Sequence, residues 1–314
     1  MIVKNIAFIF PGQGAQYLGM GKELADNFPE AMEVFDKANK ILDMDIKNLC
    51  FKGPIEQLNI TENTQPAILT TSLAFATILK KRKIIPKITA GLSLGEYASL
   101  SIANSISLEE VLPLVKKRGK FMQEAVPIGV GTMAAIMGLG KVEIEEICKQ
   151  SSQYGIVEAA NYNCPGQTVI AGEVNAVKKA CEIAKKMGAK RTTLLPVSAP
   201  FHSSLLSPAG RKLKEEIKKY KFSNTNIPIV SNVNASIVQD AQTIKSNLIK
   251  QVSSSVLWEE SMNKMIDEGI NIFIEIGPGK ALTSFAKKIS KDITCLRVED
   301  LKTINETFNN LEVN

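Results

Sequence analysis

The chain has 314 residues, of which 45% are hydrophobic, and its formal net charge is +6. This length predicts about two domains, and the hydrophobic share is enough for a sizeable core, so the composition is that of an ordinary globular protein. No apolar run approaches membrane-spanning length, and the sequence opens without the basic segment and apolar core of an export signal. Lysines are mixed with glutamates along the predicted helices, as at 212–219, which indicates solvated helices rather than a patch for nucleic acid.

The five cysteines are odd in number, widely scattered and without any C-x-x-C pair. This usage predicts neither a disulfide framework nor a zinc site. We therefore expect a reducing compartment, the cytoplasm, and no metal. The modest positive charge leaves open a weak attraction for anionic ligands or acidic partners.

A short apolar strand is predicted at 5–10, and it ends in the glycine-rich loop 11–16. The glycine spacing does not fit a dinucleotide-binding fingerprint, and no Gly-Lys-Ser/Thr follows as in a Walker loop. The loop is either a plain strand-to-helix turn or the wall of a pocket. In the second case Gln13 and its backbone would line the carboxyl end of the strand, where open α/β sheets place their sites.

Apolar spacing predicts a helix at 20–42, a connection at 43–54 and a longer helix at 62–81. The longer helix carries Gln65 and Pro66 in its predicted first turn, where proline is tolerated. It is apolar enough to lie buried behind the strand that follows it.

The stretch 89–97 is the most informative in the sequence. It reads Thr-Ala-Gly-Leu-Ser-Leu-Gly-Glu-Tyr, with Ser93 between two glycines, after an apolar run and before a helix-forming one. We interpret it as a nucleophile elbow, in which Gly91 and Gly95 let strand and helix approach closely. The free N–H groups at the helix start, notably that of Leu94, would then face the charge that develops on an attacked carbonyl. An ordinary glycine-bounded turn is the alternative interpretation of the bare pattern.

A helix is predicted from 107 to about 125, opened by a capping box at Ser107 and Glu110. Arg118 lies in this helix among apolar residues, so it needs either an anionic partner or a route to water. A surface arginine that extends to solvent is the alternative to a binding role.

Between 129 and 197 the predicted order is strand, helix, strand, strand, helix, strand. This βαββαβ order predicts a ferredoxin-like subdomain inserted into a larger domain formed by 1–128 and 198–314. Asn161 and Asn163 lie near its middle turn. Turn chemistry alone explains them, although they could also face a cleft against the larger domain.

His202 is the only histidine in the sequence, so any Ser-His mechanism must use it. It follows two prolines in a loop between a predicted strand and a predicted helix at 205–220, and such a rigid loop commonly presents a catalytic side chain. We therefore predict that His202 is the general base for Ser93, with a rate that rises as the imidazole loses its proton. The remaining chain predicts a strand near 229–230, helices before Gln251 and at 257–268, and a strand at 272–276 whose Gly-Pro-Gly opens the last substantial helix.

From end to end, the chain resembles the malonyl-CoA:acyl carrier protein transacylases. The resemblance rests on six ordered stretches, 8–16, 91–97, 118–123, 160–167, 197–202 and 275–279. It departs from the family at Leu92, where histidine usually precedes the serine, so the packing beneath the elbow must differ. Together with the elbow, the resemblance implies a large α/β-hydrolase-like domain with a parallel sheet.

The resemblance also implies roles. Ser93 would be acylated, Arg118 would bind the malonyl carboxylate, and Gln13 with Leu94 would form the oxyanion hole. Gln251 would orient His202 through an oxygen. The remaining expected substrate contacts are Asn161, Asn163 and Ser198.

The implied reaction is ping-pong transfer of a malonyl group from malonyl-CoA to the pantetheine thiol of acyl carrier protein, in fatty acid synthesis. Exchange of a thioester for an ester requires no cofactor. We expect a monomer with no nucleic-acid or membrane partner. A polyketide-pathway acyltransferase and a serine thioesterase or other hydrolase remain alternatives, as does a non-catalytic docking subunit for carrier protein.

Overall fold

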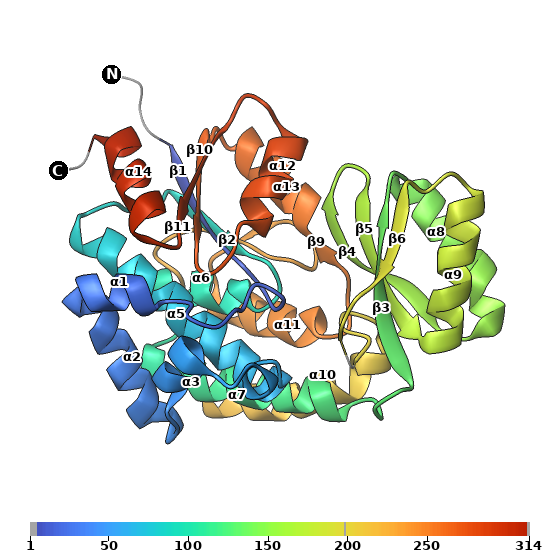
Figure 1. The fold of residues 1–314 in the computed structure, drawn as a ribbon, viewed down its shortest axis with the longest axis horizontal. Helices are drawn as coiled ribbons and strands as arrows, with labels where there is room; N and C mark the ends of the chain where they lie inside the picture. The colour runs from blue at the N-terminus through green and yellow to red at the C-terminus, as the bar shows by residue number, and fades with distance from the viewer. Residues whose placement is uncertain (1–4, 198, 313–314) are drawn as a thin grey trace.

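Two sheets organise the chain (Figure 1). The computed structural model describes residues 5–197 and 199–312. Within them, the larger sheet has six strands in the order β11-β10-β1-β2-β7-β8, and the smaller has five in the order β6-β3-β5-β4-β9. Figure 1 shows the smaller sheet with its two helices, α8 and α9, as a separate lobe at the right of the view.

The larger sheet is mostly parallel. Its strands are β1 (Ile6–Phe10), β2 (Ile88–Gly91), β7 (Ile229–Val230), β8 (Ile237–Val238), β10 (Ile272–Ile276) and β11 (Thr294–Val298). All pairs are parallel except β7 with β8. Because a parallel sheet is covered on both faces, its strands have continuous apolar sequences, as in β1, where every residue is buried.

Helices cover both faces of this sheet. The helices in the same part of the chain are α1 (Lys22–Asn27), α2 (Pro29–Leu42), α3 (Ile46–Lys52), α4 (Ile55–Leu58), α5 (Thr61–Lys81), α6 (Gly95–Ile102), α7 (Leu108–Glu124), α10 (Ser207–Glu216), α11 (Ala241–Gln251), α12 (Trp258–Asp267), α13 (Ala281–Ile289) and α14 (Leu301–Leu311). Alternate residues of β1 enter different cores: Phe8 and Phe10 join the cluster of α2, α5 and α7, whereas Ile9 joins that of α12 and α13. The parallel sheet between two helical layers confirms the predicted α/β fold class.

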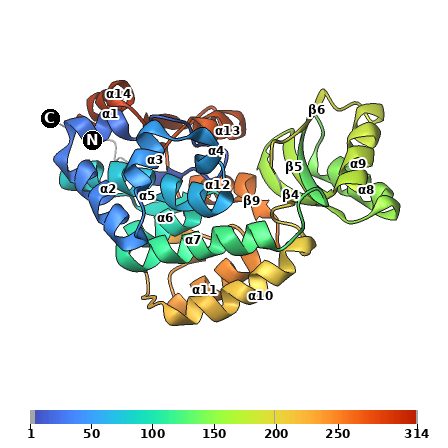
Figure 2. The same ribbon diagram turned by 60° about the horizontal axis from the view of Figure 1, so that its bottom comes forward.

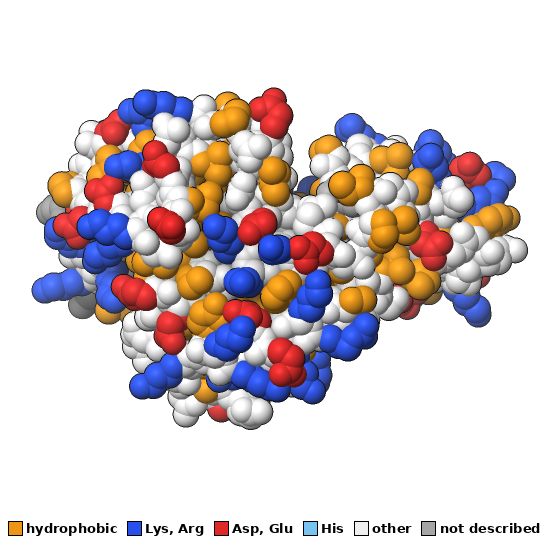
Figure 3. All heavy atoms as spheres, turned by 90° about the horizontal axis from the view of Figure 1, so that it is seen from below, with side chains coloured by type: hydrophobic (Ala, Val, Ile, Leu, Met, Phe, Trp, Pro, Cys, Tyr) orange, Lys and Arg blue, Asp and Glu red, His pale blue; other side chains and the backbone are white. Residues whose placement is uncertain are grey.

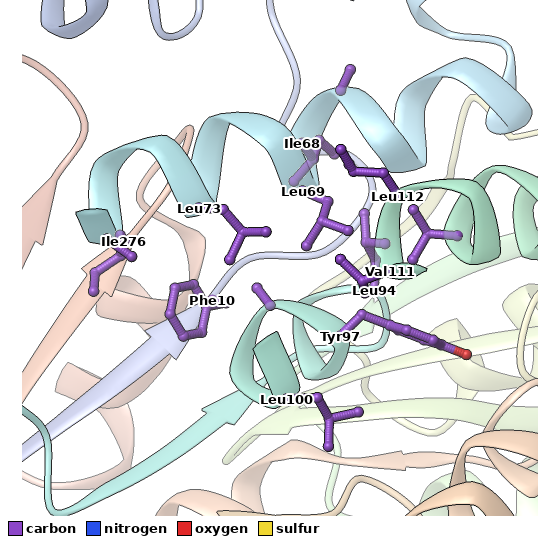
Figure 4. Packing of buried hydrophobic residues seen from close by; sticks show 14 of the residues in the cluster. Phe10, Ile68, Leu69, Leu73, Leu94, Tyr97, Leu100, Val111, Leu112 and Ile276 are labelled. Atoms are coloured by element: carbon purple, nitrogen blue, oxygen red, sulfur yellow. The ribbon is translucent and has the colours of Figure 1, made fainter. Parts of the chain in front are cut away.

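The helix α5 is the buried support of the elbow, as its apolar sequence predicts. Leu69 and Leu73 point from it toward Phe10 and the elbow helix α6, and Leu94 and Tyr97 fill the space beside α7 (Figure 4). Figure 2 shows α7 running from this core toward the smaller lobe, with α10 packed along it. Because α7 carries Arg118, the packing of α7 places this side chain in the interior of the larger part of the chain.

Several predicted helix boundaries are wrong. The helix expected at 20–42 breaks into α1 and α2 because Pro29 forces Phe28 out of the helical region, to φ −128°. The connection expected at 43–54 contains α3, whose first turn is capped by the Asp45 side chain. Pro66 lies in the second turn of α5, since the helix begins at Thr61.

Two further predictions at element ends also fail. The capping box predicted at Ser107 does not form, because its hydroxyl donates to the Glu110 carboxylate at 3.3 Å instead of accepting a backbone N–H. The helix α13 is not the last element, because β11 and α14 follow it.

The smaller sheet confirms the predicted element order. Its elements are β3 (Gly131–Met137), α8 (Lys141–Ser151), β4 (Val157–Cys164), β5 (Gln167–Glu173), α9 (Val174–Lys186) and β6 (Arg191–Leu194). The helices pack on one face over a third apolar cluster. A fifth strand, β9 (Val256–Leu257), comes from the larger part and pairs in parallel with β4. We therefore propose the division into 1–128 with 198–314 and the insert 129–197, with β9 as the connection between the two.

Among the described residues, no helix is long and apolar enough to cross a membrane.

Candidate active site

Ser93 lies at the sharp turn between β2 and α6. Its φ of 54° places it in the left-handed region, which non-glycine residues rarely occupy. A Cβ on Gly91 would lie 1.9 Å from the Gly95 carbonyl carbon, and one on Gly95 would lie 2.1 Å from the Phe10 carbonyl oxygen. Strand and helix therefore approach so closely that only glycine fits on either side of the serine, which is the steric requirement of a nucleophile elbow.

His202 lies against this serine. Its Nε2 is 2.7 Å from Ser93 Oγ, and its Nδ1 is 2.8 Å from the backbone carbonyl oxygen of Gln251. A carbonyl can only accept, so Nδ1 carries the proton and Nε2 offers its lone pair to the serine hydroxyl. Burial, with the nearby Arg118 charge, lowers the pKa of His202 to about 4. The imidazole is thus neutral at physiological pH and able to take a proton.

Arg118 lies beside the same hydroxyl. It is 1% exposed, which rules out a surface arginine that extends to solvent. Its Nη2 donates to Ser93 Oγ at 3.0 Å and to Gln251 Oε1 at 2.9 Å, and its Nη1 donates to Gln65 Oε1 at 2.8 Å. The guanidinium also lies over the Tyr97 ring, 5.4 Å from its centroid. Burial lowers the pKa of Arg118, because the cation has lost water without gaining a directly paired carboxylate.

Gln251 contacts both His202 and Arg118, but it does so with different atoms. The oxygen that orients His202 belongs to the backbone, so any residue at this position could supply it. The side chain lies on the other side: Oε1 accepts from Arg118, and Nε2 donates to the Ser93 carbonyl oxygen at 3.0 Å.

Ser93, Arg118 and His202 line one cavity of about 890 Å³ between the two sheets. The loops after β1, β2 and β10 form one side of it, and residues of β3, β4 and β5 form the other. Gln13, Asn161 and Asn163 lie in its wall, whereas Ser198 lies outside the described residues. In the part of the chain that the structure describes, the backbone N–H groups of Gln13 and Leu94 have no hydrogen-bond acceptor, so both are free to bind an oxyanion.

Leu92, the residue before the nucleophile, also lines the cavity. Its side chain packs against the core cluster of α12 and α13. A Cβ on Gly12 would lie 2.6 Å from the Leu92 carbonyl oxygen, so the first loop rests directly on the elbow.

The described residues hold no cluster of three or more His, Cys, Asp or Glu that could bind a metal ion. All five cysteines are free.

Three buried polar residues in this network were not predicted. Gln65 supports Arg118, Asn232 accepts the Ser93 backbone N–H at 2.6 Å, and Glu96 accepts from Gln251 Nε2 at 2.7 Å. Glu96 directly follows the elbow glycine, but in the sequence it looks like an ordinary acidic residue in a first helical turn. Burial raises its pKa to about 7.

Comparison with known proteins gives consistent results. Residues 7–304 match the acyl transferase domain family. The malonyl CoA-acyl carrier protein transacylase of Bacillus subtilis (strain 168) is 44% identical over 311 residues, covering 99% of this chain and 98% of that protein. The crystal structure of the transacylase of the same name from Clostridium perfringens is 49% identical, with a TM-score of 0.95, covering 98% of this chain and 97% of that one.

A further similar structure is that of a type II PKS acyl-carrier protein in complex with its malonyl-transacylase. It is 39% identical with a TM-score of 0.96, covering 98% of this chain and 100% of that one. The match to the family extends over most of the sequence, and the relatives are covered almost completely. The chain therefore belongs to the acyl transferase domain family.

Proposed function

We propose that this protein transfers the malonyl group from malonyl-CoA to the phosphopantetheine thiol of acyl carrier protein, in fatty acid biosynthesis. The observation that carries the proposal is the contact of one hydroxyl, Ser93 Oγ, with a neutral imidazole at 2.7 Å and a buried guanidinium at 3.0 Å. The first contact provides a nucleophile with its base. The second places a cation where an acyl group with a free carboxylate would extend.

The first half-reaction forms an ester. Ser93 Oγ attacks the thioester carbonyl while His202 Nε2 takes the hydroxyl proton, and the backbone N–H groups of Leu94 and Gln13 stabilise the oxyanion. When the intermediate collapses, the C–S bond breaks and the imidazolium returns the proton to the sulfur. Coenzyme A leaves as the free thiol, and Ser93 carries the acyl group.

The second half-reaction reverses these steps. The carrier-protein thiol gives its proton to His202 and attacks the ester carbonyl, and Ser93 recovers its hydroxyl proton as the C–O bond breaks. Ester and thioester exchange moves no electrons between redox states, so the proposal needs no cofactor. We also propose that the protein is a monomer. The five free cysteines support a reducing compartment, the cytoplasm, as its location.

Substrate selection rests on Arg118. Its planar fork can bind both oxygens of a malonyl carboxylate, which an acetyl group lacks. Asn161 and Asn163 are proposed as further contacts across the cavity, because the wall of the smaller sheet carries them opposite the elbow.

The test is the intact mass of the protein after brief exposure to malonyl-CoA, methylmalonyl-CoA or acetyl-CoA, with and without carrier protein. We expect a malonyl adduct that disappears when carrier protein is added and reappears on the carrier. Rapid release of free malonate without an acceptor would instead identify a hydrolase. Absence of any adduct would identify a docking subunit.

A polyketide pathway is a second candidate, because a similar solved structure is a malonyl-transacylase bound to a type II PKS acyl-carrier protein. The transfer chemistry is the same in both cases. Competition between the two kinds of carrier protein for one malonylated enzyme would discriminate them.

A further inference from the structure

A buried carboxylate outside the proposed catalytic set lies directly behind the nucleophile. Glu96 is in the first turn of α6 and is 3% exposed. Its Oε2 accepts from Gln251 Nε2 at 2.7 Å and from the Asn232 backbone N–H at 3.2 Å. The acyl-transfer steps above give this group no task. Burial of an ionisable group is costly, so a buried carboxylate at this position calls for a physical reason.

The surroundings of the Gln251 amide provide one. Its Nε2 faces three acceptors, namely Glu96 Oε2, the Ser93 carbonyl oxygen at 3.0 Å and Asn232 Oδ1 at 3.3 Å. If the amide were flipped, Oε1 would face three oxygen atoms. One of them belongs to a carboxylate, and none of them can donate while that carboxylate is ionised. Glu96 is therefore the strongest of the groups that hold the amide in its observed orientation.

That orientation matters for Arg118. It directs Gln251 Oε1 at Arg118 Nη2, at 2.9 Å, while Gln65 Oε1 holds Nη1 at 2.8 Å. Two acceptors on different helices thus fix the plane of the guanidinium. A flipped Gln251 would present an NH₂ group to the cation and leave one side of the fork without support.

We propose that Glu96 is a positioning residue: through the Gln251 amide it fixes the Arg118 guanidinium in the geometry that receives the free carboxylate of the acyl group. This inference rests on the proposed function. It makes Glu96 a determinant of selectivity for malonyl over acetyl groups. No bond to Glu96 forms or breaks during the transfer.

Charge alone predicts the opposite effect. Glu96 is negative when ionised, so its neutralisation should make the cavity more positive and favour a second carboxylate. If positioning dominates, neutralisation weakens selection of the carboxylate. The sign of the change therefore separates the two roles.

The measured quantity is the kcat/KM for malonyl-CoA divided by that for acetyl-CoA, in transfer to pantetheine. Glu96→Gln keeps the shape but replaces a charged acceptor with a neutral amide that can itself rotate. Hydrogen bonds to charged groups are stronger than neutral ones, and we expect the ratio to fall by about tenfold. Glu96→Leu removes the acceptor and should lower the ratio further. In an Arg118→Ala background, Glu96→Gln should leave the ratio unchanged, because the group it acts through is gone.

The pH dependence gives a second readout. Burial raises the pKa of Glu96 to about 7, so its charge changes near neutrality. The charged and titratable groups that act on it are Arg118 on α7 and Tyr97 on α6. His202, on the loop before α10, contacts the backbone of the same Gln251. The pKa of Tyr97 is raised to about 12, that of His202 is lowered to about 4, and Arg118 remains charged. The malonyl-to-acetyl ratio of the native enzyme should therefore rise with pH through about 7, and that of Glu96→Gln should stay level.

Glu275 provides the matched control. It is also a fully buried glutamate, but it accepts the backbone N–H groups of Leu282 and Thr283 at the start of α13. Glu275→Gln should lower the melting temperature and leave the malonyl-to-acetyl ratio and its pH profile unchanged. This variant shows what loss of a buried carboxylate does by destabilisation alone.

An unchanged or increased ratio in Glu96→Gln would overturn the positioning role. So would a ratio that falls equally in the Arg118→Ala background. Failure of the proposed function itself would look different, because the native enzyme would then show no malonyl preference for Arg118→Ala to abolish.

Discussion

Arg118 and Ser93 share a direct hydrogen bond, which runs from Arg118 Nη2 to Ser93 Oγ at 3.0 Å. The same Oγ is 2.7 Å from His202 Nε2, so the hydroxyl accepts from the cation and donates to the imidazole at once. This arrangement orients the serine proton toward its base before an acyl group arrives. It also places the nucleophile beside the group proposed to bind the carboxylate, because an acyl group on Ser93 must extend past the guanidinium.

Ser93→Ala should abolish the acyl adduct without loss of fold. The hydroxyl is the proposed attachment point, and alanine tolerates the elbow only slightly less well than serine at a φ of 54°. Intact mass after exposure to malonyl-CoA measures the adduct, and circular dichroism checks the fold. An adduct that persists in this variant would exclude Ser93 as the nucleophile.

The lowered pKa of His202 predicts the pH at which the reaction slows. Because burial lowers the pKa of His202 to about 4, the neutral base is already formed at neutral pH. The kcat/KM for acetyl-CoA, which brings no carboxylate to Arg118, should be level through the ordinary histidine range near pH 6.5 and should fall only as the pH approaches about 4. The sequence alone predicts a rise at the ordinary histidine pKa, and the structure moves that rise to lower pH.

The same pKa shift affects stability. The folded-state pKa lies below the unfolded one, so burial of neutral His202 stabilises the fold above about pH 6.5, and this contribution is lost as the pH falls toward about 4.

His202→Ala should lower transfer by roughly 10²- to 10⁴-fold, as expected for a positioned general base. A variant with native rates at neutral pH would require a different base.

Gln251→Ala separates the backbone of this residue from its side chain. The carbonyl that holds His202 Nδ1 is retained in the variant, so acylation by acetyl-CoA should keep its pH profile. The side-chain contact to Arg118 is lost, so the malonyl-to-acetyl ratio should fall. Kinetics with the two thioesters across pH test both statements. A shifted pH profile would mean that the side chain also orients the base.

The sequence predicts which residues meet at this site, but it does not predict the buried polar residues that hold them in place. The elbow, the single histidine and the βαββαβ order are local patterns, and each lies where it was predicted. The contact of Glu96 with Gln251 joins residues 155 positions apart, and the elbow pattern beside Glu96 does not indicate where its side chain points. The late strand β11 was missed because it is an edge strand with partly exposed side chains and so lacks a continuous apolar run.

Recognition of the carrier protein is the least specific prediction. Lysines and arginines are interspersed with acidic side chains on the face in Figure 3, so no large surface of one sign marks a docking site there. Lys190 and Arg191 are exposed at β6, the edge strand of the smaller sheet. If they attract an acidic carrier protein, charge reversal at both should raise its KM, and the effect should weaken with added salt. Unchanged carrier-protein kinetics would remove them from consideration.

Arg118→Ala is the variant that separates a malonyl transferase from a general serine acyltransferase. Removal of one partner of a buried, hydrogen-bonded charge pair costs about 2–5 kcal/mol, and each 1.4 kcal/mol is about tenfold. The kcat/KM for malonyl-CoA should therefore fall by roughly thirty-fold to several thousand-fold.

Acetyl-CoA brings no carboxylate that the variant would leave unpaired. Loss of the cation also removes a buried charge that acetyl cannot match. The alanine takes away the hydrogen bond to Ser93 Oγ, but the base remains in place at His202 Nε2. The acetyl rate should therefore hold or rise, and selectivity should collapse or invert. The ratio of the two specificity constants in native and variant enzyme is the measurement. An equal fall for both thioesters would make Arg118 a support of Ser93 or a contact of coenzyme A, and malonyl selection would then have to depend on other residues.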